Sequence, residues 1–481
     1  MKKIIYTLFS LLSGVTLISC SKDFTETQFF QEKQAQPLTS VEELTSFVNG
    51  TYARMRDVNY LGAYYLAYGE VRSDEMYNLQ KYGRLVETGD YTLIASKRDP
   101  RYTWEHIYRV VANANFIIAT SENLTWLRST DATAIANQVK NLKAQAYAIR
   151  GIAFFDLLRL YGQKYVENGT GLGIPIPTVY NPTARSSRPT IEQTENQIEV
   201  DLAKALELFQ DVATYQGVSL DDLVNTSDKT AISPLAVKLY QSRFYLYKEN
   251  WAQVRTLSLE ILNSGKYAIM PSADLLASFV KPSATNSIFE LAVGVNGSLG
   301  TDSYEYLLNS GGYGDLLLTP AAVALYDNAD VRKSLLVEDD GDYYLDNKFP
   351  DLKSQTNVKL ARVEEVYLNL VEAYLRENDE TNALTYYNRL RTQRGLSASA
   401  NVTFEDFRNE KLRELVGEGF RYWDLLRWSK IDNTFVIPQY NKTGVSDPTK
   451  NKTVPNDLFA FPIPQTEIDS PYSDVAQNPG Y

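Results

Sequence analysis

The chain has 481 residues, 44% of them hydrophobic and 22% charged, so it can bury a large core and is too apolar to be disordered. Its 48 Lys and Arg residues against 59 Asp and Glu give a net charge of -11, and no basic run stands out, which argues against a nucleic-acid partner. One His and one Cys exclude Cys/His zinc sites, Ser-His-Asp triads and disulfide scaffolds. We therefore expect no cofactor and no Cys/His metal site, and only carboxylates, hydroxyls and lysines remain as possible catalysts.

Residues 1–19 are predicted to be an export signal. Lys2 and Lys3 precede an apolar stretch of 15 residues from Ile4 to Ile18, which is short for a membrane span. The stretch leads to Cys20, in a pattern that resembles the lipobox of bacterial lipoproteins, where the thiol takes a diacylglyceryl group. Because Cys20 is the only cysteine, we expect it to become the acylated first residue of a membrane-tethered protein. An ordinary signal peptide with an incidental thiol is the alternative.

A long amphipathic helix is predicted from about Ile135 to Tyr161. Apolar residues recur there at steps of three and four, and Gly162 is the expected stop. Segment 169–189 follows, with three glycines and four prolines, and is predicted to be an irregular surface connection. The next predicted helix is amphipathic and covers 191–209.

Two helical hairpins are predicted in the C-terminal half. The first begins at Ser233-Pro234, an N-cap followed by proline at the first helical position, and its second helix covers 251–265. The other hairpin is expected at 360–374 and 383–395. Each takes about 34 residues, the period of tetratricopeptide-like units, which must stack on neighbours to bury their apolar faces. The sequence therefore predicts an all-α, mainly helical protein.

Three long regions are predicted to be irregular, namely 57–100, 271–351 and 434–481. Together they exceed a third of the chain that follows the export signal. Loops of this length inside a folded domain usually carry function. We therefore look for the functional site in these regions.

Two motifs are interpreted as structural. The sequence GTGLG at 169–173 looks like a phosphate loop, but Pro175 and Pro177 follow, so no helix N-terminus is available for an anion. The single histidine, His106, precedes an apolar helical stretch and is expected to be a packed or hydrogen-bonded residue rather than a catalyst.

Two groups of carboxylates are also expected to be structural. Glu410, Glu414 and Glu418 form a stripe of carboxylates on a predicted helix. Arg413 and Arg421 follow Glu410 and Glu418 by three residues and are expected to pair with them. Such pairing lowers the pKa of a carboxyl group, which suits a general acid poorly. The acidic segment 338–346 could gather Ca²⁺ around a glycine turn, although its spacing is not that of an EF-hand loop. We expect a solvated acidic turn, and calcium binding between Asp339 and Asp346 is the alternative.

Several motifs occur in order along most of the chain. They are RGIAFFDLLRLYG at 150–162, GIPIP at 173–177, DVR at 330–332, RVEEVYL at 362–368, EKLREL at 410–415, EGFRYWDLLRW at 418–428, FPIP at 461–464 and QNPGY at 477–481. With the lipobox, these motifs closely resemble the SusD/RagB family of outer-membrane nutrient-binding lipoproteins. The departures are small, such as Lys411 where the family often has Arg and Val371 where it often has Ala.

The resemblance implies a tetratricopeptide-like scaffold with ligand-binding loops inserted between its repeats. It also implies an N-terminal region over 20–230 and a C-terminal region over 231–481, packed as one globular unit. Family members lie on the cell surface over a SusC-like TonB-dependent transporter and act as a hinged lid that captures glycans, or in some branches peptides. We therefore expect a lipid-anchored outer-membrane binding protein that is not an enzyme. The alternatives are a surface glycoside hydrolase with two carboxylates and a protein-only scaffold.

The ligand site is expected in two tyrosine-rich segments. A glycan site needs exposed aromatic planes flanked by short polar or Arg side chains. The family places its ligand loops in similar parts of the chain, although no aligned motif transfers a binding residue. The expected ligand contacts, each of which could instead be an ordinary packed side chain, are Tyr77, Asn78, Tyr82, Arg84, Tyr91, Tyr304, Tyr306 and Tyr313.

Overall fold

A computed structural model describes residues 37–181 and 183–481 of the chain. The predicted export signal and Cys20 lie outside the described residues. Residues Thr39–Tyr481 form one compact unit, and the boundary expected near residue 230 stays a prediction. Within the described residues, no helix is long and apolar enough to cross a membrane.

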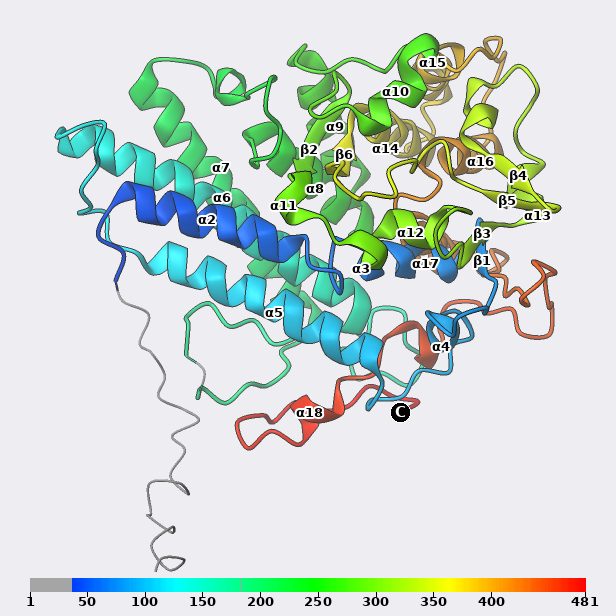
Figure 1. Ribbon diagram of the computed structural model, residues 1–481, viewed down its shortest axis with the longest axis horizontal. Helices are drawn as coiled ribbons and strands as arrows, with labels where there is room; N and C mark the ends of the chain where they lie inside the picture. The colour runs from blue at the N-terminus through cyan, green and yellow to red at the C-terminus, as the bar shows by residue number, and fades with distance from the viewer. Residues whose placement is uncertain (1–36, 182) are drawn as a thin grey trace, which may run out of the picture. The chain divides into compact units, whose positions relative to one another are not determined.

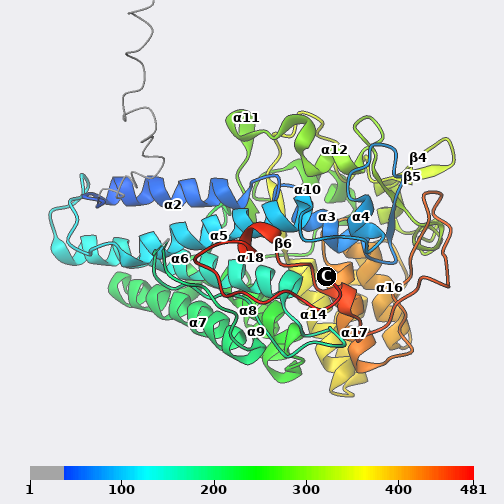
Figure 2. The same cartoon turned by 90° about the horizontal axis from the view of Figure 1, so that it is seen from below.

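The first half of this unit is built on four long helices that pack as successive neighbours (Figures 1 and 2). They are α2 (Val41–Met55), α5 (Arg98–Ala119), α6 (Ala132–Tyr161) and α7 (Ile191–Gln216). Side-chain caps fix the start of three of them, with Ser40, Asp131 and Thr190 accepting from backbone N–H groups of the first turn. The predicted helix ending at Tyr161 is confirmed, and Gly162 ends it in an extended conformation.

Both predicted hairpins are confirmed. They are α8 (Pro234–Tyr247) with α9 (Trp251–Asn263), and α14 (Val363–Arg376) with α15 (Glu380–Thr392). Helix α9 also packs against α14, so the two hairpins stack on each other as tetratricopeptide-like units do. One expected boundary is wrong: Leu360 belongs to strand β6 (Val358–Arg362), and the helix begins at Val363.

The regions predicted to be irregular contain short elements that the sequence pattern did not reveal. Helix α3 (Tyr64–Val71) is buried at every residue, so it shows no polar face from which a helical period could be recognised. Strands of three to five residues pair antiparallel as β1–β3, β2–β6 and β4–β5. The strands are β1 (Met76–Asn78), β2 (Ser287–Leu291), β3 (Leu316–Leu318), β4 (Val337–Asp339) and β5 (Asp342–Tyr344).

The remaining helices are mostly short and hold the connecting segments. They are α4 (Val86–Gly89), α10 (Leu275–Val280), α11 (Gly294–Gly297), α12 (Tyr304–Leu308), α13 (Pro320–Val323), α16 (Phe404–Leu415), α17 (Arg421–Ile431) and α18 (Gln465–Ile468). Segment 169–189 contains no helix or strand among its described residues, as predicted.

A network of buried ion pairs surrounds Glu414 on α16. Its carboxylate accepts from Arg362 at 2.6 Å, from Arg394 at 2.8 Å and from Arg332 at 3.0 Å, and all four side chains are nearly inaccessible to solvent. Burial alone would raise the pKa of Glu414, but the three guanidinium groups hold it well below its usual range. The expectation that this carboxylate is structural agrees with its surroundings.

The neighbouring carboxylates differ in one respect from the expected pairing. Glu410 does pair with Arg413, as expected. Glu418, however, lies beyond the end of α16 and pairs with Lys348 at 2.6 Å and Arg362 at 2.8 Å. Arg421, the partner expected for Glu418, instead binds Asp74, because α17 turns away from α16 after the glycines at 417 and 419.

Candidate functional site

Two segments far apart in the sequence meet through the short strands β1 and β3. The strands pair antiparallel with Asn78 opposite Leu316, and the backbone N–H of Leu79 donates to the carbonyl of Asp315 at 2.9 Å. The pairing brings the two tyrosine-rich segments together, as Figure 1 shows at β1 and β3.

The buried amide of Asn78 fixes the turn that follows β1. Its Nδ2 donates to the carbonyl of Arg84 at 2.7 Å, and its Oδ1 accepts from the backbone N–H of Gln80 at 2.6 Å. Segment 79–84 therefore closes on itself. Asn78 therefore fixes the conformation of the turn that carries Tyr82 and Arg84.

A second turn brings Tyr306 and Tyr313 together. The backbone N–H of Tyr313 donates to the carbonyl of Tyr306 at 2.7 Å. The two ring centroids lie 5.4 Å apart with the planes at 64°, an edge-to-face arrangement. Gly312 allows this close turn, since a Cβ at that position would lie 2.7 Å from the carbonyl oxygen of Tyr306.

Tyr82 and Arg84 join these two rings at the surface. The Tyr82 and Tyr313 ring centroids are 5.7 Å apart, and the Arg84 guanidinium carbon lies 3.5 Å from the Tyr313 centroid. Tyr82 is 50% exposed and the other three side chains are half-buried. We call Tyr82, Arg84, Tyr306 and Tyr313 the aromatic cluster.

An ion pair beneath the aromatic cluster anchors Arg84. Its Nη1 lies 3.0 Å from Oδ2 of Asp315, whose carboxylate is fully buried. Burial raises the pKa of Asp315, and the Arg84 guanidinium partly offsets this shift. A guanidinium has five N–H donors, so Arg84 can hold the tyrosine rings in place and still donate to a ligand. Flat aromatic faces beside such donors can bind the C–H faces and hydroxyl edges of a sugar.

Four of the eight predicted contacts are not exposed platforms. Tyr77, Asn78, Tyr91 and Tyr304 are between 3% and 6% exposed. Tyrosine next to glycine or asparagine in a sequence window does not reveal which way the ring points, because the ring suits a core as well as a surface. Of the eight residues, only the four of the aromatic cluster therefore remain candidates for direct contact with a ligand.

The surroundings of two of these tyrosines explain their burial. The hydroxyl of Tyr77 donates to Asp342 at 2.9 Å, and its ring packs in an apolar group with Leu317 and Tyr344. The ring of Tyr91 lies 4.1 Å from the guanidinium carbon of Arg72, which is itself buried. Tyr77 thus ties β1 to the β4–β5 hairpin, and Tyr91 ties the end of segment 76–91 to Arg72.

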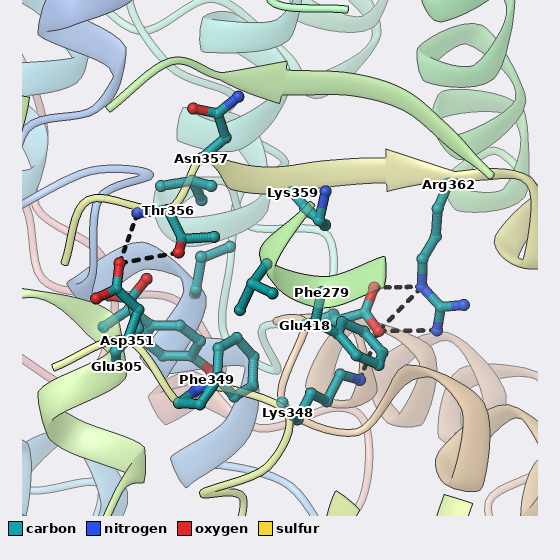
Figure 3. A pocket seen from close by; sticks show the side chains of 16 residues that line it. Phe279, Glu305, Lys348, Phe349, Asp351, Thr356, Asn357, Lys359, Arg362 and Glu418 are labelled. Carbon is teal, nitrogen blue, oxygen red and sulfur yellow. Dashed lines mark hydrogen bonds and ion pairs between the residues drawn. The ribbon is translucent and has the colours of Figure 1, made fainter. Parts of the chain in front are cut away.

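Tyr304 lines a pocket beside α12 whose lining includes no residue of the aromatic cluster. Its ring packs edge-to-face on Phe349 at 5.5 Å. The pocket is lined by apolar side chains and by charged groups from α12, β6 and the segment 348–351, as Figure 3 shows. Its lysines and its arginine are each paired with a carboxylate: Lys348 with Glu418, Lys359 with Glu290, and Arg362 with Glu418 and Glu414.

Glu305 differs from the other charged groups of this pocket. No Lys, Arg or His nitrogen among the described residues lies within 4 Å of its carboxylate. Burial raises the pKa of Glu305 to about 7, the backbone N–H of Glu305 and the hydroxyl of Ser303 oppose the shift, and Asp351 adds to it. Helix α12 thus presents Tyr306 to the aromatic cluster and Glu305 to the pocket.

The raised pKa of Glu305 predicts a pH-dependent loss of stability that Glu305→Gln removes. The folded protein keeps a proton that the unfolded chain releases near pH 4.5, so stability falls as the pH rises from about 4.5 to 7 and levels off above. As the pH rises from 5 to 8, the free energy of unfolding of the variant should therefore come to exceed that of the wild type by up to about 3 kcal/mol. Urea unfolding at several pH values measures this difference, with the exposed Glu338→Gln as control. Parallel pH profiles for wild type and Glu305→Gln would contradict the prediction.

The acidic segment 338–346 forms the β4–β5 hairpin, and its carboxylates are dispersed. Asp340 and Gly341 make the tight turn, both with positive φ. Asp342 accepts from Tyr77, while Asp346 accepts from the backbone and hydroxyl of Ser310 at 2.9 and 2.6 Å. Within residues 37–181 and 183–481 no group of three or more His, Cys, Asp or Glu side chains could hold a metal ion. The hairpin thus agrees with the expected acidic turn.

Two residues next to the aromatic cluster were not found from the sequence. Lys81 places its ammonium 5.1 Å from the centroid of Tyr82, and Asp315 anchors Arg84 from a position more than two hundred residues away in the sequence. Lys81 is adjacent to Tyr82, which could have suggested it. Asp315 has no local signal, because its role depends on the register of β1 and β3.

The structure belongs to the class of helical proteins that combine tetratricopeptide-like hairpins with long inserted segments. Residues 343–481 match the SusD family profile, and residues 26–246 match a related profile described as starch-binding and associating with the outer membrane. The chain belongs to the SusD/RagB family.

Individual relatives agree with this assignment. A SusD-like protein of Bacteroides ovatus is 20% identical over 421 residues, which cover 75% of this chain and 70% of the relative. The crystal structure of a SusD superfamily protein from Bacteroides thetaiotaomicron matches with a TM-score of 0.78 at 25% identity, covering 92% of this chain and 100% of that one. Surface glycan-binding protein A from Bacteroides fluxus shares the fold at 20% identity, with a TM-score of 0.70 over 92% of this chain and 100% of that one.

Proposed function

We propose that this protein is a cell-surface lipoprotein of the outer membrane that binds an oligo- or polysaccharide through the aromatic cluster. It delivers the glycan to a SusC-like TonB-dependent transporter, over which it acts as a hinged lid. The observation that carries the glycan proposal is the meeting of Tyr82, Arg84, Tyr306 and Tyr313 on inserted segments of the scaffold. The starch-binding and outer-membrane description of the matched family supports it, as does the glycan-binding name of the relative from Bacteroides fluxus.

Binding rather than hydrolysis is the proposed activity. The carboxylates of the signature helix, Glu410 and Glu414, are buried in ion pairs with arginines. Burial raises their pKa values, but the arginines outweigh this effect, so both pKa values are lowered. A general acid for glycoside cleavage needs a raised pKa and access to the substrate. Incubation with soluble starch, laminarin and xylan, followed by a reducing-end assay, should return each polysaccharide intact.

Affinity electrophoresis tests the ligand class directly. The mature protein without its lipid runs in native gels that contain soluble starch, laminarin, xylan or a neutral peptide hydrolysate. Retardation by at least one polysaccharide supports glycan binding, whereas binding of peptides alone would favour the peptide-importing branch of the family. The lid role has its own test, because mild detergent extraction should co-purify a TonB-dependent transporter in near-stoichiometric amount.

The membrane anchor is expected at Cys20, which lies outside the described residues. Cys20→Ala removes the thiol that would take the diacylglyceryl group, so the variant should not incorporate radiolabelled palmitate and should leave the membrane fraction. One buried acyl chain gives only weak membrane binding, whereas several give a stable anchor. Ser21→Ala, which keeps the thiol, is the matched control and should be labelled like the wild type. Equal labelling of Cys20→Ala and wild type would refute the lipoprotein proposal.

A further inference from the structure

A pocket that plays no part in the proposed glycan site lies between α6, the segment before α8 and the segment after α9. Its walls include Asn141 and Gln145 from α6, Asn225 and Lys229 from the segment before α8, and Tyr267 after α9. The cavity has a volume of about 150 Å³. This is well above the roughly 10 to 15 Å³ that one water molecule needs, so the pocket can hold a small polar group.

Lys229 is the unusual residue of this pocket. Its side chain is 3% exposed, yet no carboxylate of residues 37–181 or 183–481 lies within 4 Å of its ammonium nitrogen. The other buried lysines described, Lys348 and Lys411, have such a partner, at 2.6 Å from Glu418 and 2.8 Å from Asp424. A buried ammonium without a counter-charge is costly, which indicates that a partner from outside the chain completes this environment.

Neutral groups of the chain satisfy the ammonium of Lys229 only in part. It donates to the carbonyl of Ala284 at 2.6 Å, and the carbonyl of Thr285 lies at the limit of 3.5 Å. The ammonium also lies 5.2 Å from the ring centroid of Tyr267. An ammonium has three donors, so one strong hydrogen bond and one weak contact leave capacity for a further acceptor.

Tyr267 supplies a second unused donor. Its hydroxyl is buried and makes no hydrogen bond of normal geometry among the described residues. The nearby hydroxyl of Ser233 interacts with it weakly and also accepts from the backbone N–H of Ala236. A buried hydroxyl without a partner is unfavourable. The carboxylate of the lining, Asp228, is exposed and accepts from the backbone and hydroxyl of Thr230 at 3.0 and 2.6 Å, so it does not serve Lys229 or Tyr267.

We propose that this pocket binds a small oxyanion group, a carboxylate or a sulfate, through the ammonium of Lys229 and the hydroxyl of Tyr267. The anion would accept hydrogen bonds from both groups and supply the missing counter-charge. Its source is either a free anion or the acidic group of a sugar. The proposal does not rest on glycan binding at the aromatic cluster, because none of its residues belongs to that cluster.

The titration of Lys229 is the direct measure of such an anion. Burial lowers the pKa of Lys229 to about 8, while Glu290 opposes the shift and Lys359 adds to it. An anion beside the ammonium favours the charged form, so it must raise this pKa. Incorporation of lysine labelled with ¹³C at Cε makes each lysine visible by NMR and leaves its three N–H donors intact, and the signal missing in Lys229→Arg assigns Lys229.

The experiment adds sodium sulfate, acetate or glucuronate to the protein at constant ionic strength, balanced with sodium chloride. The expected result is a saturable rise in the pKa of Lys229 with at least one anion. Tyr267→Phe, which removes only the hydroxyl, should weaken the apparent affinity severalfold. Glucuronate binding more tightly than acetate assigns the site to an acidic sugar, and equal binding assigns it to a free anion.

A structural clamp to Ala284 is the competing role for Lys229, and it predicts a different outcome. If Lys229 were only a clamp, no anion would change the pKa of Lys229, and Tyr267→Phe would have no effect on it. That result would overturn the proposal. Lys229→Met adds a second readout, since it should abolish the stabilisation by millimolar sulfate in a thermal-shift assay. Lys266→Met, at an exposed ion pair with Asp222 near the same segment, should retain that stabilisation.

Discussion

Replacing Tyr82, Tyr306 and Tyr313 together by alanine should abolish detectable glycan binding and leave the protein folded. Each aromatic face contributes on the order of 1 kcal/mol, which corresponds to roughly a fivefold change in affinity per ring. The triple variant should therefore lose at least about a hundredfold in affinity. Because Tyr82 is half exposed and the other two rings are only half-buried, the melting temperature should change by only a few degrees.

Single variants separate stacking from hydrogen bonding in the same experiment. Tyr82→Phe keeps the ring and should retain most of the affinity, whereas Tyr82→Ala should not. Arg84→Met keeps the apolar stem but removes the donors, so it should weaken binding and loosen the turn that Asp315 anchors. Tyr180→Ala, which removes a ring that is 56% exposed on segment 169–189, is the matched control. Calorimetry or gel retardation with the polysaccharide found in the screen measures all four, and full binding by a folded triple variant would place the site elsewhere.

Glu414→Gln should be among the most destabilising single substitutions in this chain. It removes the charge that faces Arg332, Arg362 and Arg394 in the core. Breaking one partner of a buried ion pair costs about 3 to 5 kcal/mol, because the remaining charges stay buried. Urea unfolding at pH 7 should show a loss of this size.

The pH dependence of this loss follows from the lowered pKa of Glu414. A carboxylate whose pKa is depressed in the folded state stabilises the fold above its unfolded value of about 4.5, and this contribution disappears as the pH falls through the folded value. The gap between wild type and Glu414→Gln should therefore narrow in acid. Glu405→Gln lies on the same helix with a side chain that is 75% exposed, and it should change stability by less than about 0.5 kcal/mol. A loss at Glu414 as small as that at Glu405 would contradict the structural role of the network.

The sequence predicted the long helices because their apolar residues repeat along one face. Helix α6 shows this repeat from Ile135 to Tyr161, and Ser233 with Pro234 marks the start of α8 by capping chemistry alone. Helix α3 was missed for the opposite reason, since all of its residues are buried and no face is polar. Strands as short as β1 and β3 show no alternation that could be recognised.

The candidate site was predictable only as two separate segments. Tyrosines near 82 and 306 could be proposed from composition, but their meeting depends on the register in which Asn78 faces Leu316. That register is a non-local property, as is the ion pair that holds Arg84 on Tyr313. Tyr304 and Tyr306 illustrate the same limit of local sequence information. They lie two residues apart on α12, yet Tyr304 packs on Phe349 and Tyr306 on Tyr313, and the local sequence does not predict which ring is buried.

The aromatic cluster and the buried network around Glu414 have no residue in common, and this separation bears on how such a protein can change over evolutionary time. The rings are held by short turns, by the pairing of β1 with β3 and by the ion pair of Arg84 with Asp315, whereas the helices depend on arginines and carboxylates placed elsewhere. Under the proposed function, substitutions of the exposed rings can therefore change the sugar that is bound without disturbing the network that maintains the fold. A laboratory library confined to Tyr82, Tyr306 and Tyr313 could exploit the same freedom and search for new carbohydrate specificities on an unchanged framework.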